Sequence, residues 1–600
     1  MSLLTGRTKA TALWNLESFA SDRPSSAFRL ARVVAAGVVA VLCATGGASV
    51  AVAASPAPNE PANLTLLPGA SFTALPDLGV VGSRTFLYQP AEKFSPAPML
   101  TPVLFVYPDI GYPTDEAAWS SLKALGLIDL AESKKAVIVV QNPTGGTWGA
   151  DDLTVHQGVT SYIWGANTAA SGKPALTYNR LNYVIAEGRG ATFANQYLTQ
   201  APAVNRIAGI ATFGGSMPDV PEGAPVPAYI AGGSEKAIDF YKSVNDVDSQ
   251  SGDAFVNTVN PAKKVIVQAK NAQRFRSDLI ADAYASLFEH TARQALTTTV
   301  WTDVNTPEEF VLMERPNLEE LDLSQVLVSG DATGTTGQTR WYEWVPDEII
   351  DDTDGDKTYP LVISLHGSGD HEIYEAESNG WIDVAGDERI IVAAPFTGST
   401  PAVVNLLAEL KAKYPIDPTR VYLTGFSAGG VGTINASTAN PSMFTAIAPM
   451  AAPFGSANAL AAQNDLIDLP TLLTTGENDV YAIVDATAAN PYPAVSNTFR
   501  NLIRAYAGVN NIPIPATFDF AAHHIWGIPL ENHQTLEYPA WGYPLKTAEL
   551  SKDGVPLMKF MLGSTLEHTH YLPYGEVAWD FLKQFSRDQT TKAITYTAAD

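Results

Sequence analysis

Two halves of the chain carry the same succession of strand-like and helix-like segments, and this internal repeat limits the possible folds more than any other feature. Three pairs of segments match in the same order, at offsets of 256, 258 and 254 residues. They are 84–90 with 340–346, 102–106 with 360–364, and 126–131 with 380–385. Self-similarity at a nearly fixed offset is the sequence signature of a repeated structural unit. We therefore expect two related domains.

Both halves alternate short apolar runs with stretches of helical periodicity. The runs at 102–106 and 360–364 are continuous apolar segments of the kind that form buried parallel strands. Strands that alternate with helices give a mostly parallel sheet covered by helices. The sequence predicts the α/β class, with domains at 55–310 and 326–590, an acidic linker at 311–325 and a C-terminal tail at 591–600.

The N-terminal region has the pattern of an export signal. An apolar run at 33–52 follows two arginines and ends in small residues, which is typical of a cleaved signal peptide. We expect a signal peptide at 1–54 and a secreted mature chain. The alternative is an uncleaved membrane anchor, because about twenty apolar residues can span a bilayer. The single cysteine, Cys43, lies inside this run, so the mature chain would contain no disulfide.

The charge balance argues against two classes of partner. The chain has 37 Lys and Arg against 62 Asp and Glu, a net charge of -25, and no basic run. Such a chain is repelled by nucleic acid and by anionic membranes. We therefore expect neither nucleic acid nor, after signal cleavage, a membrane as partner. Hydrophobic residues make up 46% of the chain, enough to fill real cores. The oligomeric state stays open.

A glycine-flanked serine lies between a strand-like run and a helix-like stretch. The run 420–424 leads directly into Gly425-Phe426-Ser427-Ala428-Gly429, and 431–439 can form a helix. Gly-x-Ser-x-Gly in a strand–turn–helix setting is the pattern of a nucleophile elbow. The tight turn needs small residues on either side of the serine. We expect Ser427 to be a nucleophile and the Ala428 N–H to be an oxyanion donor; the alternative is an ordinary glycine-rich turn.

A candidate acid follows the serine in the chain. Asp479 lies in the loop after the apolar run 470–475, where a carboxylate can orient an imidazole and stabilise it once it is protonated. Glu477 and Asp485 are the alternative acids.

The candidate base comes next in the same order. His568 and His570 lie between an apolar strand at 555–562 and a helical pattern at 576–586. We expect His568 to be the base, with His570 as the alternative. Zinc at these two histidines would need a third ligand, and none is evident, so we expect neither a metal nor another cofactor.

The loop after the strand-like run 361–364 is the second candidate source of oxyanion donors. It reads Leu365-His366-Gly367-Ser368-Gly369, and α/β-hydrolases place a main-chain donor in this loop. We expect the N–H of Gly367 or Ser368 to face that of Ala428. The His366 side chain would then have a structural role.

Residues 336–588 resemble the secreted α/β-hydrolase esterases grouped with poly(3-hydroxybutyrate) depolymerases and feruloyl esterases. The segments that carry the resemblance are 365–367, 417–430 and 579–587. The resemblance implies a serine carboxylic-ester hydrolase that works through an acyl-enzyme without a cofactor. It places the nucleophile, acid and base on Ser427, Asp479 and His568. The ester, small molecule or polymer, does not carry over.

The first half has lost these residues and resembles a degenerate α/β-hydrolase domain. Its elbow should follow the run 181–186, where Arg189 stands at the serine position and Glu187 and Ala191 replace the two glycines. Lys236 stands at the position of Asp479. We expect no independent hydrolysis from this half, whether it is a duplicate or an unrelated α/β domain.

Two other functions remain open from the sequence. A prolyl-oligopeptidase-like peptidase uses the same elbow and residue order, but no blade-like repeat precedes the second half. The second alternative function is that of a non-catalytic exported binding protein.

Two minor features have two interpretations each. The segment 352–356 resembles half of a calcium loop, but Ile363 replaces the expected glutamate, which favours an acidic turn. The aromatics between acid and base would either line an apolar pocket or pack a cap. They are Trp526, Tyr538, Trp541 and Tyr543.

Overall fold

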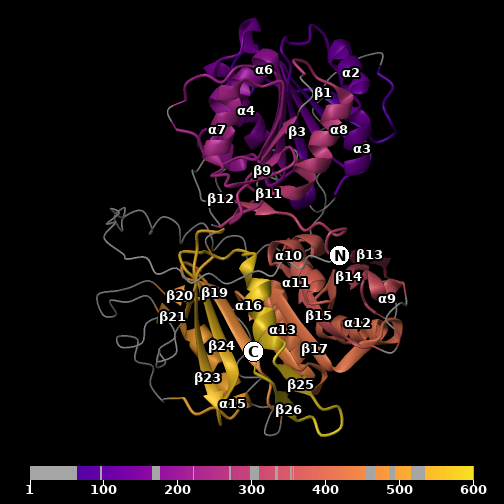
Figure 1. The fold of residues 1–600 in the computed structure, drawn as a ribbon. Helices are drawn as coiled ribbons and strands as arrows, with labels where there is room; N and C mark the ends of the chain where they lie inside the picture. The colour runs from indigo at the N-terminus through magenta and orange to yellow at the C-terminus, as the bar shows by residue number, and fades with distance from the viewer. Residues whose placement is uncertain are drawn as a thin grey trace, which may run out of the picture. The chain divides into compact units, whose positions relative to one another are not determined.

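Two ten-stranded sheets with the same strand order form the framework of the described structure (Figure 1). The computed structural model describes residues 64–598, with gaps at 95–97, 165–175, 221, 269–271, 297–309, 331–335, 352–354, 356, 453–466, 485–493, 515–533 and 539. The expected signal peptide lies outside the described residues, as do Asp485, Trp526 and most of the candidate calcium loop. Among the described residues, no helix has the length and apolar character needed to cross a bilayer.

The first sheet has a parallel centre and antiparallel margins. Its strands, in spatial order, are β1 (Ser71–Ala74), β2 (Thr85–Gln89), β4 (Val137–Gln141), β3 (Val103–Tyr107), β5 (Asn182–Glu187), β6 (Gly209–Phe213), β7 (Ala228–Ala231), β10 (Lys264–Gln268), β9 (Ala254–Val256) and β8 (Ser249–Ser251). The strands from β4 to β10 pair in parallel, and those outside them pair antiparallel.

The second sheet repeats this plan strand by strand. Its strands, in spatial order, are β13 (Leu323–Ser329), β14 (Arg340–Pro346), β16 (Ile391–Pro395), β15 (Tyr359–Leu365), β17 (Ile416–Phe426), β18 (Ala446–Met450), β19 (Thr471–Gly476), β24 (Val555–Gly563), β23 (Leu545–Lys552) and β22 (Gln534–Leu536). The strands from β16 to β24 are again parallel.

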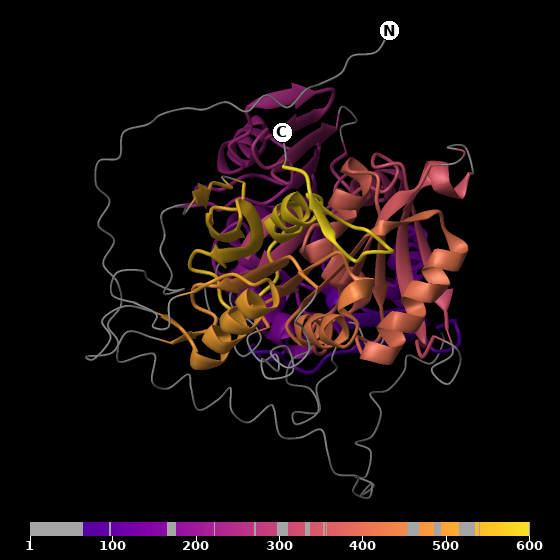
Figure 2. The ribbon, with the colours of Figure 1, turned by 90° about the horizontal axis from the view of Figure 1, so that it is seen from below.

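Helices cover both faces of each sheet (Figure 1 and Figure 2). In the first domain they are α2 (Asp115–Ala124), α3 (Leu127–Lys134), α4 (Ala150–Ile163), α6 (Gly188–Phe193), α7 (Glu235–Val244) and α8 (Ser277–Ser286). In the second they are α9 (Asp347–Ile350), α10 (Glu372–Ser378), α11 (Trp381–Asp387), α12 (Thr400–Lys413), α13 (Ala428–Ala439), α15 (Asn497–Val509) and α16 (Pro573–Leu582). The predicted fold class, two tandem α/β-hydrolase-like domains with mostly parallel sheets, is confirmed.

The apolar runs are continuous because both faces of the central strands are buried. Along β3, Leu104 and Val106 belong to one apolar cluster, with residues of α2, α3 and α8. Val103, Phe105 and Tyr107 belong to another, with residues of α4 and α6. Successive side chains of a strand point to opposite faces, so a single strand contributes to two cores.

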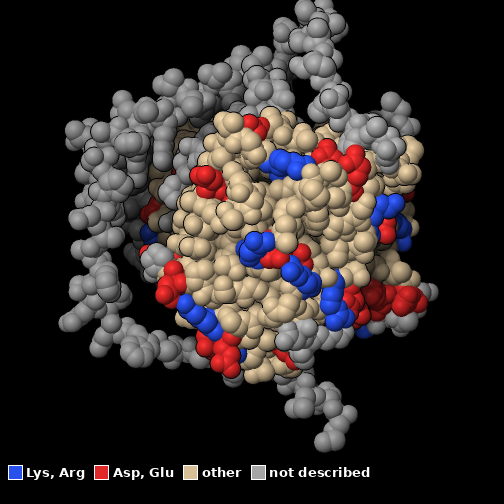
Figure 3. Space-filling view, turned by 90° about the horizontal axis from the view of Figure 1, so that it is seen from above, with Lys and Arg blue, Asp and Glu red and all other residues tan. Residues whose placement is uncertain are grey.

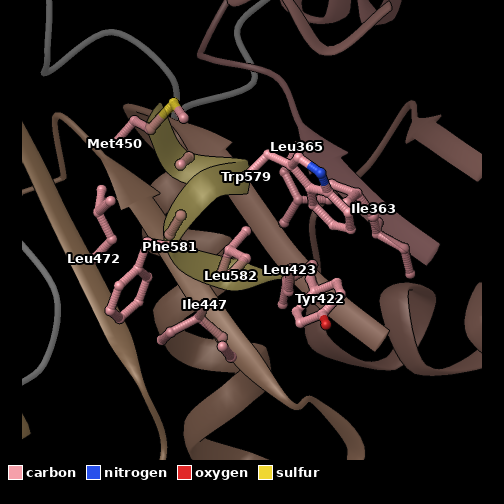
Figure 4. Packing of buried hydrophobic residues seen from close by; sticks show 14 of the residues in the cluster. Ile363, Leu365, Tyr422, Leu423, Ile447, Met450, Leu472, Trp579, Phe581 and Leu582 are labelled. Carbon is pink, nitrogen blue, oxygen red and sulfur yellow. The ribbon is translucent and has the colours of Figure 1, made fainter. Parts of the chain in front are cut away.

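Helix α16 packs against one face of the second sheet. Trp579, Phe581 and Leu582 lie in one buried cluster with side chains of β15, β17, β18 and β19 (Figure 4), and the Trp579 ring meets Tyr422 edge to face at 5.5 Å between centroids. The helix expected at 576–586 spans Pro573–Leu582 instead, because β25 (Phe585–Arg587) pairs with β26 (Ile594–Tyr596). Strand β26 lies in the expected tail.

Strand pairing supports the proposed repeat. Tyr107 lies opposite Ala186 in the first sheet, as Leu365 lies opposite Gly425 in the second. Gly126 and Gly380, a matched pair in the sequence, precede α3 and α11 with φ of 71° and 77°. Glycine is suited to this left-handed conformation because it has no Cβ.

Buried ion pairs connect the two domains, whose described residues belong to one compact unit. The Glu377 carboxylate of α10 accepts from Arg180 Nη2 at 2.5 Å and from Arg315 Nε and Nη2 at 3.1 and 3.2 Å. Burial raises the pKa of Glu377, but Arg180 and Arg315 outweigh it and lower the pKa to about 2. Strand β12 (Phe310–Glu314), which covers the start of the expected linker, pairs with β11 (Thr291–Ala295) at the end of the expected first domain.

Replacing Glu377 by Gln should lower the free energy of unfolding by about 3 kcal/mol, because two guanidinium groups lose their buried counter-ion. Denaturant unfolding measures this difference. Glu388→Gln is the matched control, since Glu388 pairs with Lys583 at the surface, and it should cost less than about 1 kcal/mol.

The pH dependence gives a second readout of the same group. Because the folded pKa of Glu377 lies below the unfolded value of about 4.3, its stabilisation is complete above that value and is lost as the pH falls towards 2. The difference in the free energy of unfolding between the wild type and Glu377→Gln should therefore shrink as the pH falls from about 4.3 towards 2. A constant stability difference down to pH 2 would show that the ion pair does not act in this way.

Candidate active site

Ser427 occupies a strained turn between β17 and α13. Strand β17 ends at Phe426, α13 begins at Ala428, and Ser427 between them has φ 51° and ψ -112°. A positive φ is uncommon for a residue with a Cβ and marks local strain, which is concentrated at functional sites. The Ser427 N–H donates to Met450 O at 2.9 Å. The predicted strand–turn–helix setting of the elbow is present.

Two glycines permit this turn by close backbone packing. A Cβ on Gly429 would lie 1.9 Å from the carbonyl oxygen of Leu365, and one on Gly425 would lie 2.7 Å from the backbone of Gly429. Side chains at these positions would push α13 away from the ends of β15 and β17. Both glycines therefore have the steric role that the sequence predicts.

The structure brings Ser427, His568 and Asp479 together in one chain of hydrogen bonds. His568 Nδ1 lies 2.9 Å from Asp479 Oδ2, and His568 Nε2 lies 2.8 Å from Ser427 Oγ. A carboxylate only accepts, so Nδ1–H donates to it and Nε2 is the acceptor for the serine hydroxyl. Asp479 is fully buried, and the His568 side chain is 13% exposed.

Further hydrogen bonds hold the buried Asp479 carboxylate. Its Oδ1 accepts from Tyr481 N at 2.9 Å, and Thr475 Oγ1 lies 3.4 Å from Oδ2. The Tyr481 ring meets the His568 ring edge to face at 4.9 Å, and Phe426 contacts it at 5.0 Å. The imidazole is thus held by two hydrogen bonds, to Asp479 and to Ser427, and by two aromatic contacts.

The loops that carry the acid and the base are joined by their main chains. Asn478 N donates to Leu566 O and Glu477 N donates to Gly563 O, both at 2.8 Å. A Cβ on Gly476 would lie 2.3 Å from Leu566 O, so glycine again allows the approach. The Glu477 carboxylate accepts from Thr565 N at 3.0 Å. Glu477, the alternative acid, therefore ties the two loops together.

His570, the alternative base, has a different set of partners. Its Nε2 lies 3.0 Å from Glu375 Oε2 of α10, and its ring stacks on Phe426 at 4.0 Å. The geometry places His568 and not His570 at Ser427. Among the described residues, no group of three or more His, Cys, Asp or Glu could hold a metal ion.

Sequence analysis missed the partner of His570. Glu372, Glu375 and Glu377 are buried along one helix, facing Arg340, His570 and the Arg180–Arg315 pair. A helix with three glutamates is normally expected to expose them to solvent. Nothing in the sequence indicates that these three are buried. Their partners are distant in the chain.

The loop after β15 lies close to the elbow. His366 contacts Gly367 O through Nδ1 at 2.8 Å and Phe396 O through Nε2 at 2.9 Å, in keeping with the expected structural role. Within the described ranges, no hydrogen bond occupies the N–H groups of Ala428, Gly367 or Ser368.

Three of the four candidate pocket aromatics lie within the described residues and take part in packing. Tyr543 O accepts from Tyr571 Oη at 2.6 Å, and the Trp541 and Tyr571 rings meet at 6.4 Å. Tyr538 packs against the core of the second domain. These contacts are those of an aromatic cap.

The first domain keeps the elbow backbone without its nucleophile, in a register that corrects the sequence alignment. Gly188, with φ 53°, follows β5 as Ser427, with φ 51°, follows β17. A Cβ on Gly190 would lie 2.3 Å from Tyr107 O, as one on Gly429 would approach Leu365 O. Gly188, not Arg189, is the counterpart of the serine. The alignment was off by one residue because Ala186 replaces the first elbow glycine.

A carboxylate fills the space beside this vestigial turn. Asp109 Oδ1 accepts from Arg189 N at 2.8 Å, and Arg189 N is the counterpart of the Ala428 N–H. Arg274 and Arg189 both form ion pairs with Asp109. Lys236 pairs with Asp219 at the surface.

On the face shown in Figure 3, acidic and basic residues alternate without a continuous basic patch.

The elbow packing predicts opposite effects of two glycine substitutions. Gly429→Ala should destabilise the fold by about 3 kcal/mol, because the new Cβ meets main-chain atoms that cannot move independently. Gly508→Ala in α15 is the matched control, since nothing lies within 4 Å of its Cβ position; it should be neutral or stabilise by about 0.5 kcal/mol. Equal unfolding midpoints for the two variants would contradict the steric account.

Comparisons with known proteins give local sequence matches to esterases. A bifunctional acetylxylan esterase/xylanase from Neocallimastix patriciarum is 30% identical over 132 residues, which are 20% of this chain and 19% of that protein. Poly(3-hydroxyalkanoate) depolymerase C from Paucimonas lemoignei is 29% identical over 115 residues, 15% of this chain and 27% of that protein. The chain thus spans less than a third of either relative. No model of a known protein family matches it.

Solved structures give similar but weak matches. Acetyl xylan esterase from Aspergillus awamori aligns with 43% of this chain and 99% of its own length, at 14% identity and a TM-score of 0.29. A feruloyl esterase module from Clostridium thermocellum aligns with 42% of this chain and 83% of its own length, at 14% identity and a TM-score of 0.27. The fold class rests on the strand order described above. Over these local stretches, the chain is similar to an acetylxylan esterase/xylanase and to poly(3-hydroxyalkanoate) depolymerase C.

Proposed function

We propose that the chain is a secreted serine carboxylic-ester hydrolase with Ser427, His568 and Asp479 as its catalytic triad. The observation that carries the proposal is the position of His568, whose two ring nitrogens contact Ser427 Oγ and Asp479 Oδ2 at 2.8 and 2.9 Å. Nucleophile, base and orienting acid within hydrogen-bond reach are the arrangement that activates a serine hydroxyl.

In the proposed reaction, Ser427 Oγ attacks the ester carbonyl while His568 Nε2 takes the hydroxyl proton. The carbonyl oxygen becomes an oxyanion, held by the N–H of Ala428 and by that of Gly367 or Ser368. His568 then gives the proton to the departing alcohol, which leaves an acyl group on Ser427. Water repeats the path, with its proton passing to His568, and releases the carboxylic acid and the free serine.

Asp479 holds the imidazole in one tautomer and stabilises its cationic form. Because Asp479 is fully buried and accepts from His568, Tyr481 and Thr475, its carboxylate cannot turn away from the ring. In the proposed cycle, the proton stays on His568 and does not pass to Asp479.

The proposed substrate is a carboxylic ester whose acyl part contacts apolar surface. Val480 and Tyr481 follow the acid directly and are 70% and 43% exposed, and Tyr481 borders the base. The similar proteins are named for acetylxylan and for poly(3-hydroxyalkanoate), so esters of small acyl groups and of hydroxyalkanoates are the first to test. The apolar run at 33–52, which has the pattern of an export signal, supports the proposal that the chain acts outside the cell.

Ser427→Ala should lower kcat for p-nitrophenyl acetate and butyrate by about 10⁴-fold or more, because no attacking atom remains. Ser586→Ala in β25 is the control and should keep wild-type activity. Hydrolysis at wild-type rates by Ser427→Ala would remove the proposed nucleophile. A panel of acetyl, feruloyl and hydroxybutyrate esters then ranks the substrates.

Asp479→Asn should lower kcat by about 10⁴-fold with little change in KM, because the amide no longer favours the productive tautomer. Glu477→Gln, two residues away in the same loop, should change stability more than kcat. Steady-state kinetics and thermal unfolding of both variants separate the two roles. A larger loss of kcat in Glu477→Gln than in Asp479→Asn would reassign the acid.

A further inference from the structure

A cavity beside the junction of the two domains is lined by arginines and aromatic rings. The lining residues are Met99, Trp164, Tyr178, Arg180, Arg293, Gln294, Ala295, Phe310 and Tyr374. Eight of them come from the first domain and its strands β11 and β12, and Tyr374 comes from α10. No residue of the candidate triad lines it.

Two buried arginines, Arg180 and Arg293, line this cavity. Arg293 N donates to Arg180 O at 2.9 Å, so the two side chains start from neighbouring main-chain positions. Each residue is only 5% exposed. A guanidinium charge removed from water is costly unless a counter-ion or hydrogen-bond acceptors compensate it.

The carboxylates nearby do not balance these charges. Glu377 is shared between Arg180 and Arg315. Arg293 donates Nε to Ile207 O and Nη2 to Pro225 O, and no carboxylate pairs with it among the described residues. Burial lowers the pKa of Arg293 to about 9, so it remains a cation at neutral pH. The chain has 62 acidic residues, yet none with a described position fills this gap.

Polar atoms at the cavity also lack partners. Arg180 Nε and Nη1 and Gln294 Oε1 are buried without a hydrogen-bond partner in the part of the chain described here. An unsatisfied buried donor costs about 1–3 kcal/mol, and more when it is charged. Native structures rarely keep several such atoms at one place unless a ligand or ion meets them.

We propose that this cavity is a binding site for a small monovalent anion, chloride or a short carboxylate such as acetate, held between Arg180 and Arg293. The anion supplies the missing negative charge and accepts from the free Arg180 donors. The empty space is about 330 Å³, including the part open to solvent.

The site adjoins the segment that carries the base. The Tyr374 ring meets His570 edge to face at 4.8 Å, and Ala295 O accepts from Thr569 Oγ1 at 2.8 Å. Two walls of the cavity thus touch residues next to His568. A bound anion should stabilise the residues that line the cavity. We therefore expect it to raise the thermal stability of the protein, and this can be measured in the absence of substrate.

Thermal unfolding of the whole protein tests the site at fixed ionic strength, with sodium chloride, sodium acetate or sodium gluconate as the salt. In the wild type, chloride or acetate should raise Tm by at least about 2 °C over gluconate. A shift with chloride alone assigns the site to halide, and one with acetate alone assigns it to a carboxylate. Equal Tm in all three salts would overturn the proposal.

Variants locate the effect. Arg293→Met should abolish the anion-specific shift, whereas Arg276→Met, which removes an exposed arginine paired with Asp278, should keep it. An unchanged shift in Arg293→Met would overturn the proposal. If Arg293→Met does not fold, bromide soaked into wild-type crystals gives the decision. An anomalous peak in this cavity supports the site. A cavity that holds neither bromide nor, in a second soak, acetate contradicts it.

Discussion

The close contact between the start of α13 and the end of β15 determines where the parts of the candidate site lie. Because a Cβ on Gly429 would lie 1.9 Å from Leu365 O, only glycine lets the helix begin so near the strand. The same Cβ position would lie 2.8 Å from His366 O, so the start of α13 also borders the loop that follows β15. Gly476 permits a similar approach between the acid and base loops. Backbone packing thus sets the geometry, and the three functional side chains depend on it.

The two domains show how far this scaffold is independent of chemistry. Both have ten strands in the same order, and both keep a positive-φ turn after the central strand, at Gly188 and at Ser427. The first domain has a glycine where the second has its serine, and the Asp109 carboxylate accepts from the main-chain N–H that corresponds to an oxyanion donor. Its fold persists because two apolar clusters, one on each face of the sheet, stabilise it without reference to any site.

The sequence was most informative where local pattern and chain order decide the outcome. The elbow at Ser427 could be predicted because only one turn fits glycine–serine–glycine between a strand and a helix, and chain order then pointed to Asp479 and His568. The register of the corresponding turn in the first domain could not be predicted. Ala186 replaces the first glycine of the motif there, and only the pairing of β5 with β3 shows which residues correspond. The buried glutamates of α10 were also beyond reach. Glu377 meets Arg180, 197 residues away, and tertiary contacts of that kind leave no local pattern.

The most direct test of the central claim is peptide mapping by mass spectrometry after treatment of the folded protein with a fluorophosphonate. Such a reagent reacts with a serine only where a base activates it and main-chain donors hold the developing negative charge. The account predicts one adduct, on Ser427, that disappears in His568→Gln while the variant remains folded. An unmodified Ser427 in the folded wild type, or labelling of Ser427 that persists without His568, would contradict it.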